Sequence, residues 1–306
     1  MINKITAAID IGSYNCRMII VNNAPKIKVL KTISVPTNLI KNLSYSNEFT
    51  HENIKKTVNC LTMFSRKMLE YNVIDYRCVA TEACRQVINS DFFTEEVKNK
   101  TGLSVEIISV NEEARLCFQS CKKYFQETNN EGILFDIGGG STEISFFNVT
   151  SEKFETSSIP LGVINLSEKI NIHGKSKIIS QMNRHFKSLN ADLSNKIDPS
   201  FSLGSCSTMS TLSAIYQNLT FFDKKKIEGS LLDVGEIMKI INNLKNLKIS
   251  EMLKHPCIRK RYPLLLNGID ILEKILENFP IKQILVSQSG LTGGMIENLH
   301  WKKLNL

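Results

Sequence analysis

The sequence predicts an α/β protein made of two similar units, each with a mixed sheet. The run ITAAIDIGSYNCRMII near the start and the run ILFDIGGGSTEISFF at residues 133–147 share one pattern. In both, an apolar strand leads to an aspartate, a Gly/Ser turn and a second strand. The two aspartates, Asp10 and Asp136, lie 126 positions apart. After each run, the expected strands and helices follow the same order.

The first half of the chain reads as three strands followed by alternating helices and strands. Short runs of alternating apolar and polar residues predict the strands, and apolar residues at helical spacing predict the helices. Strands are expected at residues 6–10, 16–22, 27–35, 76–80 and 105–110, and helices at residues 51–71, 81–89, 92–101 and 112–125. This βββαβαβα order is typical of an α/β unit.

A polar segment at residues 122–131 separates the halves, after which the same order begins again. Strands are expected at residues 132–136, 143–148, 153–161, 200–204 and 283–287. Helices are expected at residues 163–170, 176–190, 208–216, 235–244, 249–253, 264–279 and 293–306. We therefore expect two domains, residues 1–122 and 123–306. As an alternative, the last helix is expected to pack back on the first domain.

The bulk composition is that of a globular protein. The chain has 306 residues, of which 42% are hydrophobic and 22% charged. No run approaches 18 consecutive apolar residues, and the N-terminus reads as a strand, so we expect neither a membrane span nor a secretory signal. The net charge of +8 attracts polyanions. Because the lysines are scattered, however, we expect no nucleic-acid partner.

The eight cysteines indicate a reducing compartment. They are Cys16, Cys60, Cys78, Cys84, Cys117, Cys121, Cys206 and Cys257. None forms a CxxC pair, so free thiols in the cytoplasm explain them best. Cys117 and Cys121 lie one helical turn apart, but no His/Cys partners stand near enough in the sequence to complete a zinc site. We expect buried structural thiols.

The glycine run of the second motif predicts phosphate binding. Glycines let backbone N–H groups approach an anion, and successive N–H groups form an anion-binding nest. Asp136 before the turn and Glu143 after it offer the oxygen ligands that Mg²⁺ prefers. A plain β-hairpin is the alternative, but it rarely needs three glycines between two carboxylates. The run is not a Walker A loop, because no Gly-Lys-Ser/Thr follows. It is not a dinucleotide fingerprint either, because a strand follows the glycines.

Several stretches together resemble one known family. They are AAIDIGSYNCRMII, VATEACRQVINS, EIISVNEEARL, FDIGGGSTEIS, SIPLGVINL, GSCSTMSTLSAI and NGIDILEKILENFPIKQILVSQSGL. They occur in the order found in the exopolyphosphatase / guanosine pentaphosphate phosphohydrolase (Ppx/GppA) family, in its short two-domain form. The resemblance implies two actin-like (ribonuclease H-like) domains with the active site in the cleft between them. It also implies a Mg²⁺ cofactor, and it allows a homodimer.

The resemblance implies roles for individual residues. The first phosphate loop comprises Asp10, Gly12, Ser13, Tyr14 and Asn15, with Arg17 beside it. Thr81 and Arg85 are expected to hold substrate phosphates, and Glu113 matches the catalytic base. The second loop and the metal site comprise Asp136, Gly138, Gly139, Gly140, Ser141, Thr142 and Glu143, with Asp10 as a third metal-binding carboxylate. Gly204 and Ser205 belong to a further phosphate-contacting loop.

Each of these residues also has a plainer interpretation. Glu112 and Glu113 at a helix start would stabilise the helix dipole without any catalytic role. Thr81 would be a helix N-cap, and Arg85 a solvated helix residue. The chain also departs from the family pattern at Tyr14, Val110, Ser207 and Thr292. None of these departures replaces an expected catalytic or metal-binding carboxylate, so we expect hydrolysis to survive while substrate preference drifts.

The leading functional prediction is a hydrolase that releases terminal phosphate from inorganic polyphosphate by Mg²⁺-assisted attack of water. The enzymatic alternative removes the 5′-phosphate of guanosine pentaphosphate (pppGpp), which contains the same type of phosphoanhydride bond. A non-catalytic binder of polyphosphate or alarmone is a hypothesis from another class, motivated by the four departures. A sugar- or acetate-kinase-like phosphotransferase shares the superfamily, but the EEARL and VATEACR stretches disfavour it.

Overall fold

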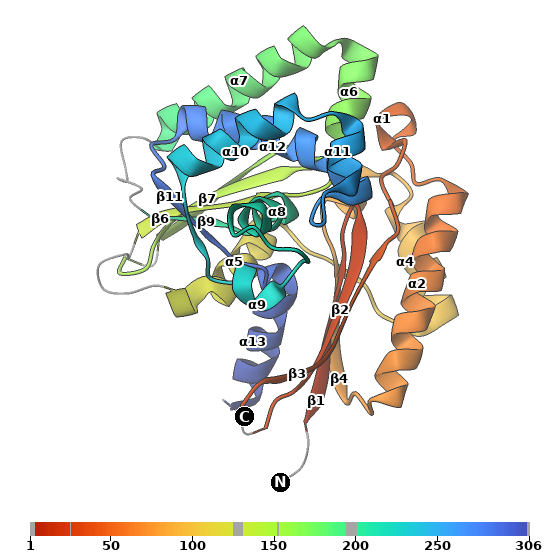
Figure 1. The fold of residues 1–306 in the computed structure, drawn as a ribbon. Coiled ribbons are helices and arrows are strands. Elements are labelled where there is room, and N and C mark those ends of the chain that lie inside the picture. Colours follow the sequence, from red (N-terminus) through yellow and green to blue (C-terminus); the bar gives the residue numbers. More distant parts are fainter. Residues whose placement is uncertain (1–3, 25, 125–130, 152, 194–200, 305–306) are drawn as a thin grey trace. The chain divides into compact units, whose positions relative to one another are not determined.

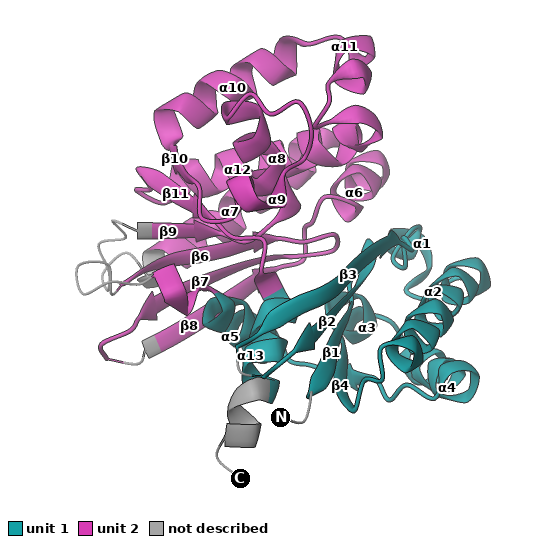
Figure 2. Ribbon diagram, turned by 60° about the horizontal axis from the view of Figure 1, so that its bottom comes forward, with its two compact units in different colours: residues 1–120, 291–306 teal, residues 121–290 magenta. Residues whose placement is uncertain are grey.

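The computed structural model describes residues 4–24, 26–124, 131–151, 153–193 and 201–304. The chain divides into two compact units (Figure 2). Unit 1 comprises residues 1–120 and 291–306, and unit 2 comprises residues 121–290. Each unit contains a mixed sheet with helices, which confirms the expected α/β fold class.

Unit 1 is built around a five-stranded sheet in the order β3-β2-β1-β4-β5 (Figure 1). Its strands are β1 Ile5–Ile11, β2 Asn15–Asn22, β3 Lys28–Pro36, β4 Asp75–Ala80 and β5 Glu106–Ile107. Its helices are α1 Leu43–Ser46, α2 His51–Glu70, α3 Glu82–Gln86, α4 Ser90–Thr101, α5 Val110–Cys121 and α13 Gly290–Leu304. In both ribbon views α2 and α4 lie on one side of the sheet, and α5 and α13 on the other.

Unit 2 repeats this plan with one added strand, in the order β10-β11-β9-β6-β7-β8. Its strands are β6 Glu131–Ile137, β7 Thr142–Asn148, β8 Lys153–Ile159, β9 Phe201–Gly204, β10 Leu231–Asp233 and β11 Gln283–Val286. Its α-helices are α6 Asn165–His173, α7 Lys175–Leu193, α8 Ser207–Tyr216, α9 Lys224–Ile227, α10 Val234–Asn246, α11 Ile249–Lys254 and α12 Tyr262–Asn278, and 3₁₀ turns occur at Lys122–Tyr124 and Arg259–Arg261.

Each sheet contains three parallel strands, and the loops that follow them lie at one edge of that sheet. In unit 1, β1, β4 and β5 run parallel, with Ile11 beside Ala80 and Ala80 beside Ile107. In unit 2, β6, β9 and β11 run parallel, with Phe135 beside Gly204. The carboxyl ends of parallel strands meet at one edge of a sheet, which is where α/β proteins bind ligands. Each unit therefore gathers its polar loops at one such edge.

Buried apolar side chains hold each unit together. In unit 1, Ile9 and Ile20 of the sheet and Phe64 and Phe93 of the helices are fully shielded from water. In unit 2, α7, α8, α10 and α12 form a helical layer over the sheet and enclose one core cluster (Figure 1). All eight cysteines are free and buried, which confirms the expectation of structural thiols.

Several expected elements need correction. The strand expected at residues 105–110 spans only Glu106–Ile107, because Ser109 caps α5, which begins at Val110. The helix expected at residues 163–170 begins at Asn165, since the backbone just before it is hydrogen-bonded to the glycine turn. The helix expected at residues 81–89 ends at Gln86. Residues 125, 200 and 305–306 of three other expected elements lie outside the described residues.

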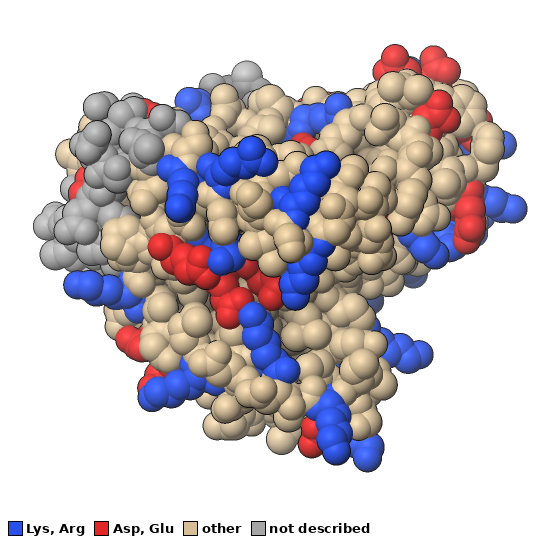
Figure 3. All heavy atoms as spheres, turned by 90° about the horizontal axis from the view of Figure 1, so that it is seen from above, with Lys and Arg blue, Asp and Glu red and all other residues tan. Residues whose placement is uncertain are grey.

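One face of the molecule shows how its charged side chains are distributed. On the face drawn in Figure 3, Lys and Arg side chains are dispersed among uncharged atoms and stand beside acidic ones. In α10 and α12, Lys245 pairs with Asp270 and Glu273, and Lys274 pairs with Glu277. Among the described residues, no helix is both long and apolar enough to cross a membrane.

Candidate functional site

The first loop is a tight turn between β1 and β2. The strands pair Asp10 with Arg17, and the N–H of Gly12 closes the turn by donating to the carbonyl of Asn15 at 3.0 Å. A Cβ atom at Gly12 would lie 3.1 Å from that same carbonyl. A side chain at this position would therefore press on the carbonyl that closes the turn.

A neighbouring segment holds this turn from one side. The carbonyl of Tyr14 accepts from the N–H groups of Thr37 and Asn38, and the carbonyl of Ser13 accepts from Ile40. In a trans peptide the N–H points opposite to the preceding C=O. The N–H groups of Tyr14 and Asn15 therefore point away from the bracing segment, as an anion-binding nest requires.

The second loop repeats this construction between β6 and β7. Asp136 pairs with Glu143, and the N–H of Gly138 donates to the carbonyl of Ser141 at 2.9 Å. The aspartate stands two residues before the turn-closing glycine in both loops. The likeness between the two sequence runs is thus a likeness of backbone geometry.

The glycine turn is anchored through three consecutive carbonyls. Those of Gly138 and Gly139 accept from the N–H groups of Val163 and Ile164 at 2.9 Å, and that of Gly140 accepts from Nδ2 of Asn165 at 2.6 Å. By the same peptide geometry, the N–H groups of residues 139–141 point to the opposite side. Consecutive N–H groups on one side of a turn can form an anion-binding nest.

Gly162 and Asn165 were not among the predicted site residues. A Cβ at Gly162 would lie 2.5 Å from the backbone of Gly139, so only glycine allows this approach. Asn165 also accepts from the N–H of Gly162 through Oδ1 at 2.8 Å. Both lie in the SIPLGVINL stretch, and the polar Asn165 within a largely apolar run is the signal that would have found it.

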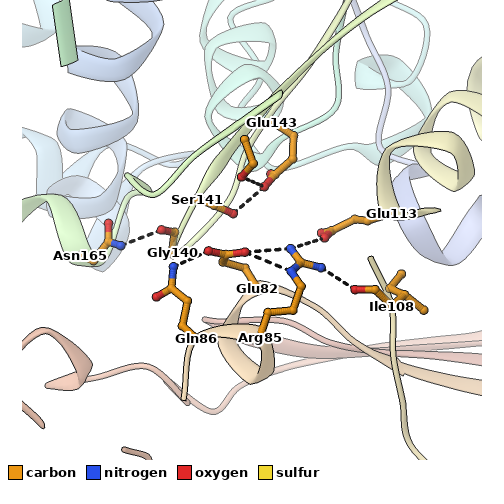
Figure 4. Close-up of polar contacts among 10 residues, drawn as sticks. Glu82, Arg85, Gln86, Ile108, Glu113, Gly140, Ser141, Glu143 and Asn165 are labelled. Carbon is orange, nitrogen blue, oxygen red and sulfur yellow. Dashed lines mark hydrogen bonds and ion pairs between the residues drawn. The ribbon is translucent and has the colours of Figure 1, made fainter. Parts of the chain in front are cut away.

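Two carboxylates of the predicted metal set are buried. Oε1 of Glu143 accepts from the hydroxyls of Ser141 and Ser158 at 2.6 and 2.8 Å (Figure 4). Burial raises the pKa of Asp10 to about 6, while Arg17 acts in the opposite direction. Asp136 is half-buried, and its charge adds to the effect of burial in raising the pKa of the Cys206 thiol to about 12.

Asp136 and Glu143, which pair on neighbouring strands of unit 2, offer carboxylate oxygens of the kind that Mg²⁺ prefers. Within the described residues no three His, Cys, Asp or Glu side chains converge on one point. Mg²⁺ is usually held by one or two carboxylates and several waters. A buried carboxylate such as Asp10, which burial alone makes reluctant to ionise, gains from a nearby cation.

The predicted base lies in the first turn of α5 and is paired with Arg85. Nη2 of Arg85 lies 3.0 Å from Oε2 of Glu113, and Nε and Nη2 also donate to Glu82 at 3.1 and 2.9 Å (Figure 4). Nη1 donates to the carbonyl of Ile108 at 2.8 Å. Arg85 is therefore not a solvated helix residue.

A second arginine supports the same helix. Nη2 of Arg77 contacts Glu106 at 2.8 Å and Glu112 at 2.5 Å. Ser109 accepts from the N–H of Glu112, and this Ser-x-x-Glu pattern is the sequence signal of a helix start that the expected strand obscured. Thr81 holds the N-cap position of α3, but its side chain makes no cap hydrogen bond there.

The third loop follows β9. Gly204 is wedged between Phe135, Met209 and Ile284, and a Cβ there would lie 2.6 Å from the side chain of Met209. The hydroxyl of Ser205 is buried and has no hydrogen-bond partner within the described structure. Such an orphaned hydroxyl at the carboxyl end of a strand fits a ligand or an ordered water.

The departures from the family pattern are also placed. Val110 is the first residue of α5, Ser207 the first of α8, and Thr292 lies in the first turn of α13. α13 belongs to unit 1, where Gly294 lies against the backbone of Leu116. Tyr14 is half-buried at the tip of the first turn.

Comparison with known proteins agrees with these features. Residues 18–302 match the family model described as the Ppx/GppA phosphatase family. A bifunctional 3-dehydroquinate synthase/phosphatase of Fusobacterium nucleatum is 28% identical over 327 aligned positions, covering 98% of this chain and 47% of that protein. A guanosine-5′-triphosphate,3′-diphosphate pyrophosphatase of Photobacterium profundum is 30% identical over 52% of this chain and 31% of its own. The chain thus spans less than half the length of these relatives.

A solved structure extends the likeness to the whole fold. The Aquifex aeolicus member of the Ppx/GppA family superposes with a TM-score of 0.80 at 28% identity, covering 98% of both chains.

Proposed function

Because the chain belongs to the Ppx/GppA phosphatase family, we propose that it is a hydrolase releasing terminal phosphate from inorganic polyphosphate by Mg²⁺-assisted attack of water. The pair of matching loops carries the proposal, since each turns backbone N–H groups to one side by fixing its carbonyls on the other. Such N–H groups bind phosphate oxygens without reading any base or sugar, which suits a substrate made only of phosphate.

The proposal gives each group of residues one task. Phosphate oxygens are bound by the N–H groups of residues 14–15 and 139–141, within the loops 12–15 and 138–142, together with Arg17, Thr81, Gly204 and Ser205. Glu113 takes the proton of the attacking water, a contribution of roughly 10²–10⁴-fold for a positioned base. Asp136 and Glu143, which pair across β6 and β7, would hold Mg²⁺ with its waters, and Asp10 is the third carboxylate of the proposed set. The ion would neutralise charge on the reacting phosphoryl group, and positioning supplies most of the remaining catalysis.

The second candidate is 5′-phosphate removal from pppGpp. The Photobacterium profundum relative is named for that reaction, and the half-buried ring of Tyr14 offers a surface on which a base can stack.

A binder without turnover is the candidate outside enzymes. The eight buried thiols favour the cytoplasm, and light scattering would measure whether the protein is a homodimer.

One assay separates these candidates. Phosphate release is measured side by side from long-chain polyphosphate and from pppGpp, with Mg²⁺ present. The proposal expects release from polyphosphate at the higher kcat/KM, and at least a 100-fold loss of kcat in Glu113→Gln. Glu112→Gln is the matched control, because Glu112 is the neighbouring glutamate and pairs with a different arginine. Binding of polyphosphate without release, or full turnover in Glu113→Gln, would refute the proposal.

A further inference from the structure

The side chain of Arg85 is committed to protein partners on three sides. Its guanidinium donates to Glu82 through Nε and Nη2, to the carbonyl of Ile108 through Nη1, and to Glu113 through Nη2. A planar guanidinium with this many fixed contacts has one orientation. A phosphate contact by Arg85 would need at least one of these interactions to be given up.

Glu82 is the partner that fixes the guanidinium plane. It takes two N–H groups of Arg85 from three residues away on α3, and it also accepts from Gln86 on the next turn. The side chains of Glu82, Arg85 and Glu113 are only 14%, 17% and 16% exposed. Their attraction is therefore less screened by water than that of a surface pair.

The charge balance of the cluster also matters. Burial opposes the charge on Arg85, but Glu113 and Glu82 outweigh it and raise the pKa of Arg85 above its usual value. Glu82 and Glu113 share the positive charge of Arg85. Glu82 therefore weakens the electrostatic attraction between Arg85 and Glu113. An anionic Glu82 also repels an anionic substrate at this point.

Arg77 provides an internal comparison. It too is shared by two glutamates, Glu106 and Glu112, but these are 55% and 43% exposed. Exposed pairs contribute little to stability, and neither partner of Arg77 is the proposed base. The two clusters have the same composition and differ in burial and in which glutamate they hold.

We propose that Glu82 and Arg85 form a positioning pair, in which Glu82 holds the guanidinium of Arg85 on the carboxylate of Glu113. Arg85 then orients the base and is not a ligand of the substrate. This inference rests on the role proposed for Glu113. It replaces the substrate-binding role that the sequence resemblance implies for Arg85.

The test compares Arg85→Met, Glu82→Gln and the control Glu106→Gln. Arg85→Met should lower kcat roughly 10- to 100-fold, because the base loses its orientation, while KM for polyphosphate stays within about threefold. Glu82→Gln should lower kcat by roughly tenfold and also lower KM, because Arg85 is released toward the anionic substrate. Glu106→Gln should match the wild type. A rise in KM above about threefold in Arg85→Met, or unchanged kcat in Glu82→Gln, overturns the inference.

A binding measurement keeps this result separate from the proposed reaction. Tripolyphosphate binding is measured by calorimetry in EDTA, where turnover is not needed, and thermal unfolding checks that each variant is folded. Glu82→Gln should bind several-fold more tightly than wild type, and the double variant with Arg85→Met should lose that gain. If the wild type binds but releases no phosphate, the proposed function fails while this test still stands. Equal affinity of wild type and Glu82→Gln overturns the inference.

Discussion

The hydroxyl of Tyr124 donates a hydrogen bond to Oε1 of Glu228 at 2.6 Å, across 104 positions of sequence. The same carboxylate accepts from the hydroxyls of Ser287 and Ser289 and, through Oε2, from the N–H of Gln288. Unit 2 begins at residue 121 and ends at residue 290. One carboxylate therefore ties the first residues of the unit to its last.

Removing this carboxylate should destabilise unit 2. Burial alone would raise the pKa of Glu228, but the Tyr124 hydroxyl, the Gln288 N–H and Lys123 bring it below its usual value. Glu228→Gln should lower the free energy of unfolding by about 1–3 kcal/mol, and Tyr124→Phe by about 1 kcal/mol. Urea unfolding followed by circular dichroism measures both. Tyr45→Phe is the control, because Tyr45 is 62% exposed. Equal midpoints for Glu228→Gln and wild type would contradict the prediction.

A methyl group at Gly162 should displace the glycine turn. Its Cβ would lie 2.5 Å from the carbonyl of Gly139 and 2.6 Å from that of Gly138, both backbone atoms that cannot turn aside. Gly162→Ala should therefore lower kcat/KM for the phosphate substrate at least about tenfold, since small displacements of a binding loop cost roughly 10²-fold. Gly235→Ala, in the first turn of α10, should leave it unchanged. Wild-type kinetics in Gly162→Ala would show that the turn tolerates movement.

Elements with many turns or a clear period were predictable from the sequence. The helix expected at residues 51–71 is α2, His51–Glu70, because twenty residues give five turns over which apolar spacing repeats. The four-residue helices α1 and α9 and the three-residue strand β10 were missed, since so few residues hold no repeat. The strand expected at residues 105–110 was wrong beyond Ile107, because the cap at Ser109 outweighs the β propensity of Ile108 and Val110.

The site was predictable as backbone motifs and much less so as side-chain contacts. The spacing of glycine and aspartate predicts a turn in each loop, and a backbone hydrogen bond closes both turns. The contact of Gly162 with the second turn depends on where the chain lies after β8, and no local sequence pattern predicts that position. The pairing of Arg85 with Glu113 depends likewise on the parallel order of β4 and β5, which sets α3 beside α5.

Metal affinity should depend on Ser158, a residue that does not reach the metal in the proposal. Its hydroxyl donates to Oε1 of Glu143 at 2.8 Å and so orients a proposed ligand. Loss of such outer partners typically costs roughly 10–100-fold in metal affinity. Ser158→Ala should raise the Mg²⁺ concentration for half-maximal phosphate release by several-fold, with the rate at saturating Mg²⁺ largely kept.

Ser157 provides the matched control for this measurement. It is the adjacent serine of β8, and successive side chains of a strand point to opposite faces. Ser157→Ala should leave the Mg²⁺ titration unchanged, and EDTA should abolish release in both variants until Mg²⁺ is restored. Identical titrations for Ser158→Ala and wild type would contradict the prediction that Ser158 supports a metal ligand.

The buried carboxyl of Asp10 should make stability depend on pH in a predictable direction. Its pKa is raised from 3.8 to about 6, first by burial, with Arg17 opposing, while the facing Cys16 and Cys78 thiols are neutral in this range. The folded protein therefore binds this proton more tightly than the unfolded chain does. That contribution is fully present below about pH 4 and is lost as pH rises through about 6. At 1.36 kcal/mol per unit it amounts to at most about 3 kcal/mol.

Asp10→Asn isolates this contribution, because asparagine cannot titrate. Urea unfolding in EDTA at pH 4.5, 6 and 7.5 should show wild-type stability falling relative to the variant over that range. Adding Mg²⁺ at pH 7.5 should reduce the difference in unfolding free energy between the two proteins. A cation near Asp10 favours the ionised carboxylate, and a ligand that binds only the folded state stabilises that state. Parallel stability curves for the two proteins would mean that water reaches Asp10. If Mg²⁺ leaves this difference in unfolding free energy unchanged, Asp10 is excluded as a metal ligand.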